Sequence, residues 1–458
     1  MRQAALTLLT VILAFSVASC ATPPKPEAAR ALPEDIVLPP ARSFDSGSVS
    51  PPSRSNAEMA QDFMDLSFAL ENGRPITVFS RFEGPVTVRL AGNVPGLANA
   101  ELSRLLDRLR NEAKIDIHQT QSSAASITVE FLPRQTMQRF VPRAACFVVP
   151  RAGSWNEYLR ASRSDLDWTT VSRRERAAIF IPNDTSPQEI RDCLHEELAQ
   201  SLGPLNDLYR LPDSVFNDDN VNSVLTGFDM LMLRAHYDRA LSSGMLANAV
   251  ALRIPEILDR LNPAGRGSGA LPPDETPRSY SAAIDTALGP GASPSRRRAA
   301  ALDAVRIAEA RGWQDGRAGF AWLALGRLAL GHEPEFARQA FARAAAIFRN
   351  HPHLGLYAAH ADSHLCAFAL ADGNAAEVIR ISGPAIEAAR RGQDAALLAN
   401  LMMIRAEALD LAGRADEARR VRLDSLGWAR YGFGSDAEVR RRLIAVAGLS
   451  PQHRTGAK

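Results

Sequence analysis

The sequence predicts two folded parts of different class, an α+β domain followed by an all-α array of helical hairpins. In residues 57–261, short segments rich in β-branched and aromatic residues alternate with helical segments. In residues 296–450, proline is scarce and apolar residues recur every three or four positions, which is typical of amphipathic helices. Two stretches rich in Pro, Gly and Ser remain, and we expect a disordered tether over residues 20–56 and a linker over residues 262–295.

The composition is that of a folded protein with balanced charge. Of the 458 residues, 46% are hydrophobic and 23% are charged, which excludes a wholly disordered chain. Lys and Arg number 53 and Asp and Glu number 51, so the formal net charge is only +2. Because this balance provides no general attraction to polyanions, we expect no nucleic-acid partner.

The N-terminus predicts an export signal and a lipid anchor. One arginine precedes an apolar stretch over residues 4–17, which is too short to span a bilayer and has the length of a secretory signal. The letters VASC that end at Cys20 resemble the bacterial lipobox, which implies a signal peptide over residues 1–19 and acylation of Cys20. Ala21 then implies sorting to the periplasmic face of the outer membrane, with the lipid bilayer as a partner. The alternative is an ordinary signal peptide with an incidental cysteine.

In the α+β part, one helix follows the last expected strand. We expect strands within residues 75–92, 126–133, 145–150 and 177–184, and an earlier helix within residues 101–113. Ser186 followed by Pro187 and an acidic first turn marks the start of a further helix, which ends at Gly203.

This helix, with the sequence IRDCLHEELAQSLG, resembles the zinc helix of metzincin-type metallopeptidases. Their motif, H-E-x-x-H-x-x-G-x-x-H, needs two ligands on one helix face and a glycine for the turn to the third ligand. Aligned on Gly203, the general-base position is Glu197, and the three ligand positions are Glu196, Gln200 and Asn206. The resemblance therefore implies a degenerate zincin-like domain in which all three histidines are replaced.

Two later segments extend this resemblance. LPDSVFND (residues 211–218) lies where matrixin-like proteases form their Met-turn, and LTGFDMLMLRAHYD (residues 225–238) is similar to their closing helix. With FEGPVTVRL upstream and CLHEELAQSLGPLNDLYRLPDSVFNDDN in the middle, the chain also resembles a family of bacterial lipoproteins known as domain of unknown function 2927. That resemblance covers residues 60–260 and implies no established activity.

The substituted motif offers only oxygen ligands, which hold zinc weakly. Three interpretations remain open: a hydrogen-bonded polar cluster without metal, a divalent-cation site completed by Asp207, Asp218 and Asp219, or no relation to metzincins. We place His195 and Asp207 beside the ligand positions rather than among them. We expect no cofactor, with a weakly held divalent cation as the alternative.

The cysteines fit an oxidising compartment. A bond between Cys146 and Cys193 would stabilise the domain by about 4 kcal/mol on the chain-entropy estimate. The alternative is that the two thiols are buried apart. Cys366 lies in an expected repeat helix, where we expect a buried, apolar role.

The C-terminal helices resemble tetratricopeptide repeats. Gly331, Gly373 and Gly413 follow one expected helix and precede another at a spacing of about 40 residues, where a helix C-terminus favours positive φ. Such arrays bind proteins or peptides, so we expect a protein or peptide partner on the repeats. A plain helical bundle is the alternative.

Two functions of different class remain open. The first is a non-enzymatic envelope lipoprotein, in which a pseudo-metallopeptidase domain and the repeats bind a partner. The second is a metal-dependent peptidase or amidase, with Glu197 as general base and unusual oxygen ligands. The missing histidines favour the first function, and the retention of Glu197 keeps the second open.

Overall fold

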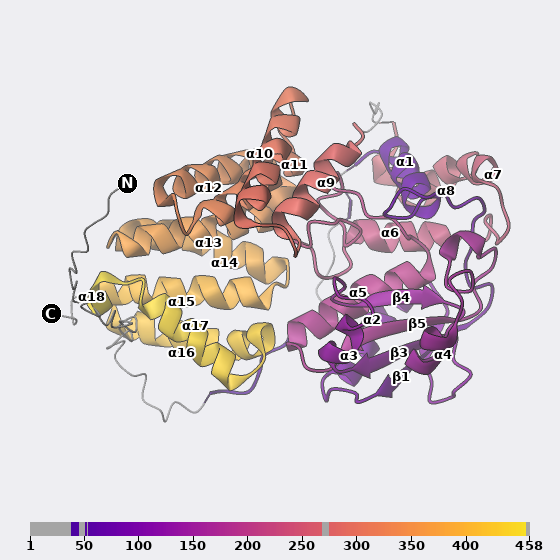
Figure 1. Ribbon diagram of the computed structural model, residues 1–458, viewed down its shortest axis with the longest axis horizontal. Helices are drawn as coiled ribbons and strands as arrows, with labels where there is room; N and C mark the ends of the chain where they lie inside the picture. Colours follow the sequence, from indigo (N-terminus) through magenta and orange to yellow (C-terminus); the bar gives the residue numbers. More distant parts are fainter. Residues whose placement is uncertain (1–37, 45–50, 53, 268–273, 455–458) are drawn as a thin grey trace, which may run out of the picture.

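The computed structural model describes residues 38–44, 51–52, 54–267 and 274–454, and it has two parts (Figure 1). A region of mixed α and β structure is followed by a region whose regular elements are helices, as the sequence predicts. The expected signal peptide and Cys20 lie outside the described residues. Within those residues, no helix combines the length and the apolar character needed to cross a membrane.

A five-stranded mixed sheet forms the centre of the first region, with the strand order β2-β1-β3-β5-β4. Its strands are β1 (Val86–Gly92), β2 (Ile117–Gln119), β3 (Ile127–Leu132), β4 (Phe147–Pro150) and β5 (Ala177–Pro182). All pairs are parallel except that the edge strand β4 runs antiparallel to β5. The sequence did not predict β2, because three residues are too few to show an alternating pattern. The expected strand over residues 75–92 forms only from Val86 onward.

The two faces of the sheet have separate cores, because successive side chains of a strand point to opposite faces. On one face, Ala177, Ile179 and Ile181 of β5 share a core with the longer helices. These helices are α1 (Asn56–Ser67), α2 (Ala98–Asn111), α5 (Pro187–Leu202), α6 (Gly227–His236) and α8 (Ile254–Leu261). On the other face, Ala178 and Phe180 pack with the short helices α3 (Arg134–Gln138) and α4 (Trp155–Arg160).

The second region is a stack of helical hairpins, seen on the left of Figure 1. Its helices are α9 (Arg278–Leu288), α10 (Pro294–Ala310), α11 (Gly316–Ala329), α12 (Pro334–Arg349), α13 (Gly355–Ala371), α14 (Ala375–Arg391), α15 (Ala395–Leu411), α16 (Ala415–Phe433), α17 (Asp436–Ala447) and α18 (Pro451–Arg454). From α9 to α17 each helix packs on the next, and α11, α13 and α15 also contact one another in series. The hairpins are therefore stacked side by side.

Two of the three glycines expected at turns between helices have the expected backbone conformation. Gly373 and Gly413 have φ angles of 76° and 75°, as expected for residues that follow a helix. Gly331 does not have a positive φ, so the expectation was wrong there. The turn between α11 and α12 is longer, and Pro334 starts the next helix without requiring a left-handed residue.

The segment expected as a linker contains a helix of the second region. In α9, Tyr280, Ile284 and Ala287 are buried in the same core as the later helices of the second region. These residues are four and three positions apart, which is helical spacing, but the Gly and Pro residues around them hide the pattern. The helical region therefore starts within the expected linker.

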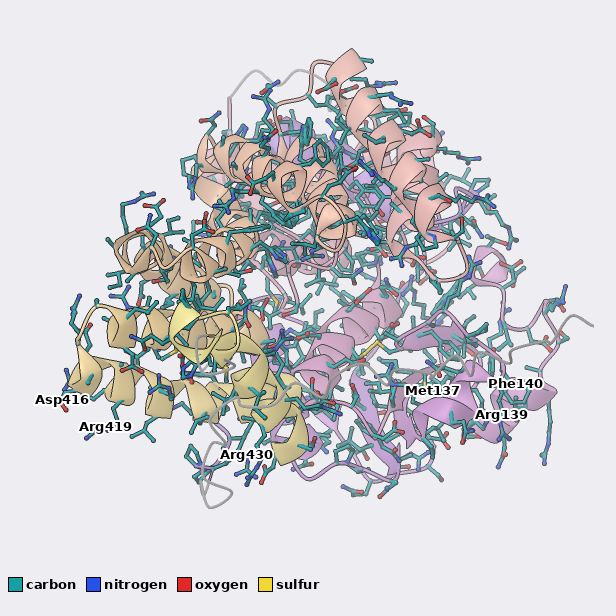
Figure 2. The ribbon with its side chains drawn as sticks, turned by 60° about the vertical axis from the view of Figure 1, so that its left-hand side comes forward. Met137, Arg139, Phe140, Asp416, Arg419 and Arg430 are labelled. Carbon is teal, nitrogen blue, oxygen red and sulfur yellow. A yellow bond between two sulfur atoms is a disulfide. The ribbon has the colours of Figure 1, made fainter. Side chains whose placement is uncertain are left out.

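The expected tether also contains an ordered stretch, residues 38–44, which packs on α16. The ring of Phe44 stacks on Trp428 with centroids 4.6 Å apart. Arg430, labelled in Figure 2, donates a hydrogen bond to the carbonyl of Pro39 at 2.8 Å. The guanidinium of Arg191 on α5 lies 5.3 Å from the centre of the Phe44 ring. This stretch thus contacts both regions.

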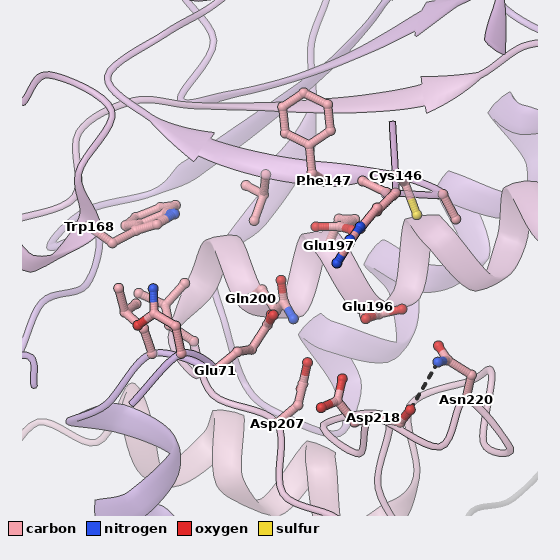
Figure 3. A pocket seen from close by; sticks show the side chains of 17 residues that line it. Glu71, Cys146, Phe147, Trp168, Glu196, Glu197, Gln200, Asp207, Asp218 and Asn220 are labelled. Carbon is pink, nitrogen blue, oxygen red and sulfur yellow. Dashed lines mark hydrogen bonds between the residues drawn. The ribbon is translucent and has the colours of Figure 1, made fainter. Parts of the chain in front are cut away.

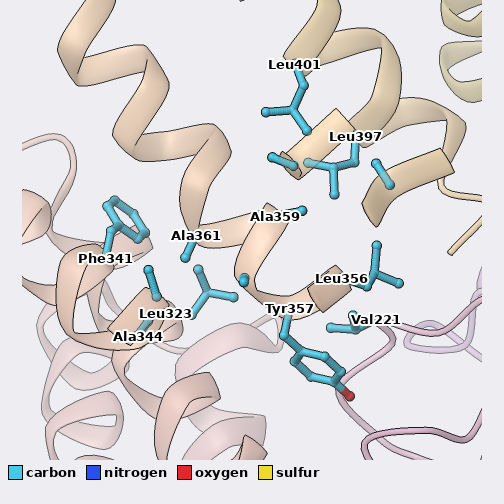
Figure 4. Packing of buried hydrophobic residues seen from close by; sticks show 14 of the residues in the cluster. Val221, Leu323, Phe341, Ala344, Leu356, Tyr357, Ala359, Ala361, Leu397 and Leu401 are labelled. Atoms are coloured by element: carbon cyan, nitrogen blue, oxygen red, sulfur yellow. The ribbon is translucent and has the colours of Figure 1, made fainter. Parts of the chain in front are cut away.

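Polar and apolar contacts join the two regions. Gln188 on α5 donates to Asp394 at 3.1 Å, and the hydroxyl of Tyr357 on α13 donates to Asp219 at 2.7 Å. Val221, from the loop before α6, belongs to the core of the helical region and lies near Tyr357 in Figure 4. The helices of the second region consequently support α5 and the loop that follows it.

Candidate functional site

A cavity of about 510 Å³ lies between α5, the edge strand β4 and the loops that follow α1 and α5 (Figure 3). Phe147 and Trp168 line it on one side. Five carboxyl groups also line it: Glu71, Glu196, Glu197, Asp207 and Asp218. Of the described residues that line the cavity, Arg143 alone is basic. The cavity is therefore acidic, with an apolar side.

Helix α5 carries three of the lining side chains and is fixed at both ends. At its start, Ser186 accepts a hydrogen bond from the backbone of Glu189, as the sequence predicts. At its end, the buried guanidinium of Arg174 donates to the backbone carbonyls of Gln200 at 2.6 Å and Gly203 at 2.5 Å. Because the last carbonyls of a helix have no partner within the helix, Arg174 fixes the end of α5.

Gly203 allows α5 to pack closely against α6. A Cβ atom at this position would lie 2.9 Å from the ring of His236, which is too close for any other residue. The glycine of the aligned motif therefore has a packing role in this chain.

A disulfide covalently links two of the elements that surround the cavity. It joins Cys146, immediately before β4, to Cys193 on α5, with 6.0 Å between the Cα atoms. The expected pairing is thus confirmed, and Cys146 itself lines the cavity. Cys366 is a buried free cysteine, as expected.

The structure brings together some of the residues that the sequence singled out. Glu196, Glu197 and Gln200 follow one another along the cavity (Figure 3). Asn206 lines a neighbouring pocket instead, and its side-chain amide donates to the backbone carbonyl of Asp65 at 3.0 Å. The third ligand position of the aligned motif is therefore occupied by a residue that binds the backbone of α1.

His195 lies in the protein core rather than beside the cavity. Its Nδ1 accepts a hydrogen bond from the backbone of Leu225 at 3.1 Å. Burial, followed by the nearby charges of Arg108 and Arg191, holds the pKa of His195 well below its usual value. The ring is thus neutral and links α5 to the loop before α6. Asp207, which we expected beside the ligand positions, lines the cavity itself.

The donor atoms at the aligned positions do not fit a zinc ion. Glu196 and Gln200 offer oxygen, whereas zinc in proteins favours imidazole and thiolate. The amide of Asn206 is already engaged with Asp65. Within the described part of the chain, no three or more His, Cys, Asp or Glu side chains are grouped so as to hold a metal ion.

Burial, followed by the charges of neighbouring carboxylates, raises the pKa of every carboxyl group that lines the cavity. Burial, followed by the charges of Glu71, Asp192 and Asp218, raises the pKa of Glu196 to about 7. Burial, followed by Glu196 and Glu71, holds the pKa of Glu197 well above its usual value. A raised pKa favours the protonated form of a carboxyl group, and that form cannot act as a general base.

Glu71 and Asp207 complete the cluster from outside α5. They share a side-chain hydrogen bond, and burial followed by the charge of Glu71 holds the pKa of Asp207 well above its usual value. Partial burial and Glu71 raise the pKa of Asp218 to about 6. Sequence reasoning missed Glu71, because no motif marks the loop after α1.

Asp229, near the start of α6, holds the loop that carries Asp218. Its carboxylate accepts hydrogen bonds from the hydroxyl of Ser214 at 2.5 Å and from the backbone of Val215 and Thr226 at 3.2 and 2.8 Å. The segment over residues 211–218 thus forms a fixed turn beside the cavity. The acidic residue early in α6 therefore has a structural role.

Comparison with known proteins connects this α/β region to one family. The family model described as protein of unknown function (DUF2927) matches residues 56–256, which confirms the resemblance seen in the sequence. The region that matches contains the sheet, α5 and all the acidic residues of the cavity. No curated protein and no solved structure matches the chain.

Proposed function

We propose that this chain is a cell-envelope lipoprotein, anchored to the bilayer through Cys20 on the periplasmic face of the outer membrane. We further propose that the protein binds a ligand in its acidic cavity without cleaving it. The α/β region would be a zincin-like scaffold that has lost its catalytic metal. The placement of α5 directly after the sheet, with the edge strand β4 and α5 on two sides of the cavity, supports this relation.

One observation carries the non-catalytic interpretation. The three ligand positions do not converge, because Asn206 binds the backbone of Asp65 and lies outside the cavity. Glu197 is buried among other carboxyl groups, and its raised pKa disfavours the charged form that a base requires. What remains is a cavity lined by five carboxyl groups and by apolar side chains, which is a property of a binding site.

The helical region is proposed as a tetratricopeptide-like array that binds a protein or peptide. Its stacked hairpins and its turns at Gly373 and Gly413 support this proposal. Because α13 and α15 already contact the α/β region, the partner would use the surfaces that this region leaves uncovered.

A metal-dependent hydrolase is the second candidate, and one observation favours it. Glu197 lines the cavity, and its Oε2 has no hydrogen-bond partner among the described residues. The test is a cleavage assay with a peptide mixture read by mass spectrometry, with and without added divalent cations. We expect the same products from the full chain, from Glu197→Gln and from buffer alone. Cleavage by the full chain that Glu197→Gln abolishes would overturn the binding proposal.

A further inference from the structure

We infer that the acidic cavity binds a primary ammonium group carried on an alkyl chain, as found in a polyamine or in a lysine side chain. This inference rests on the proposed function, because it assumes a cavity that binds without cleaving. It adds the chemical class of the ligand.

The first argument is the imbalance of charge in the cavity. Five carboxyl groups line this cavity, and the guanidinium of Arg143 is the single positive group among its described lining residues. Like charges at close range repel strongly where water is partly excluded. A positive ligand would remove this repulsion, whereas an anionic or neutral ligand would leave it in place.

The second argument is an unsatisfied acceptor aimed into the cavity. The side chain of Glu197 is 5% exposed, yet its Oε2 has no hydrogen-bond partner among the described residues. A buried acceptor without a partner is costly, so such a group indicates a donor that arrives with a ligand. An ammonium group brings three donors and can serve several carboxylates at once.

The third argument concerns shape and the apolar side of the cavity. A volume of about 510 Å³ lies within the range of sites for small organic ligands. Phe147, Val148, Trp168 and Leu205 also line it. These side chains provide contacts for the methylene groups of an alkylamine, which a bare metal ion would not use. The combination of acidic and apolar lining side chains therefore fits an alkylammonium ion.

Arg143 lies at the cavity as its single basic lining residue, and it is exposed. Its charge opposes the entry of a cation. Replacing Arg143 should therefore strengthen ammonium binding, while replacing the carboxyl groups should weaken it. These opposite effects distinguish a specific site from a general attraction to an acidic protein.

The test is isothermal titration calorimetry on the full chain in detergent, at physiological ionic strength and with calcium absent. The probes are spermidine, cadaverine and the peptide acetyl-Ala-Lys-Ala-amide, with its Nε-acetylated form as a neutral control. We expect at least one amine to bind with a one-to-one ratio, and we expect no heat from the acetylated peptide. Binding of spermidine alone would indicate a free polyamine, and binding of the peptide would indicate a lysine side chain.

Three variants complete the experiment. Glu71→Gln combined with Asp218→Asn should weaken binding by at least about tenfold, because each charge-assisted hydrogen bond contributes roughly that factor. Arg143→Gln should strengthen binding severalfold. Glu309→Gln, on the exposed face of α10, removes one negative charge elsewhere and should leave the affinity unchanged. Because removal of clustered like charges relieves repulsion, we expect the double variant to fold, which circular dichroism would verify.

Several results would overturn the inference. They are the absence of binding by every amine, equal affinity in the double variant and in Glu309→Gln, or binding of calcium with no binding of amines. The cleavage assay separates the two proposals. If no amine binds and no peptide is cleaved, the proposed ligand class alone is refuted. Cleavage that depends on Glu197 would instead refute the proposed non-catalytic function.

Discussion

The disulfide between Cys146 and Cys193 should be a large single contribution to the stability of the α/β region. The bond closes a loop across a sequence separation of 47 residues. For a loop of this length, the loss of entropy in the unfolded chain corresponds to about 4 kcal/mol at room temperature. The double variant Cys146→Ala/Cys193→Ala should therefore have a free energy of unfolding lower by about that amount.

Urea unfolding followed by circular dichroism and tryptophan fluorescence measures this change. Wild type treated with a reductant should unfold at the lower urea concentration of the double variant, and the double variant should not respond to reductant. Cys366→Ala serves as the matched control, because Cys366 is a free buried cysteine and its loss should leave the response to reductant intact. Equal unfolding midpoints for wild type and the double variant would refute the structural role of the bond.

Three further variants test side-chain contacts that position the helices and loops around the cavity. Arg174→Met should lower the free energy of unfolding, measured with urea, by about 3 kcal/mol or more, because it leaves buried carbonyls at the end of α5 without donors. A change below experimental error would contradict this role of Arg174. Gly203→Ala should destabilise by about 1–3 kcal/mol, since the added Cβ would meet the ring of His236, and an unchanged melting temperature would disprove the contact. Burial raises the pKa of Asp229 to about 6, above the value of 3.8 for an unfolded chain, so the folded state holds a proton that the unfolded state releases between these pH values. The contribution of Asp229 to stability should therefore decrease from about pH 4 to about pH 6, by at most about 1.4 kcal/mol per pH unit, and then level off. The variant Asp229→Asn should lack this decrease. Parallel curves of unfolding free energy against pH for the two proteins would contradict this prediction.

Much of the fold was predictable because it depends on local patterns. The cap at Ser186 and the short runs of β-branched and aromatic residues in β3 and β5 are signals within a few neighbouring residues. The helix α9 was hidden because its apolar spacing lies between Gly- and Pro-rich segments. The sequence also showed no sign that Phe44 is ordered, because its stacking partner Trp428 lies on α16 and no local pattern connects the two residues.

The site was predictable only where it lies on one helix. Glu196, Glu197 and Gln200 share a face of α5, and helical periodicity is sufficient to place them together. Glu71 reaches the cavity from the loop after α1, so only the tertiary structure brings it to Asp207. Asn206 points toward α1 because its amide donates to a backbone carbonyl there, and no sequence pattern predicts that contact.

The measurement that tests the central claim most directly is the metal content of the full chain, purified without chelator and analysed beside Glu196→Ala. A cavity that binds without cleaving predicts a metal content far below one atom per chain in both proteins, because Asn206 is engaged elsewhere and the remaining oxygen donors hold zinc weakly. A near-stoichiometric metal content in the wild type that is lost in Glu196→Ala would contradict the account.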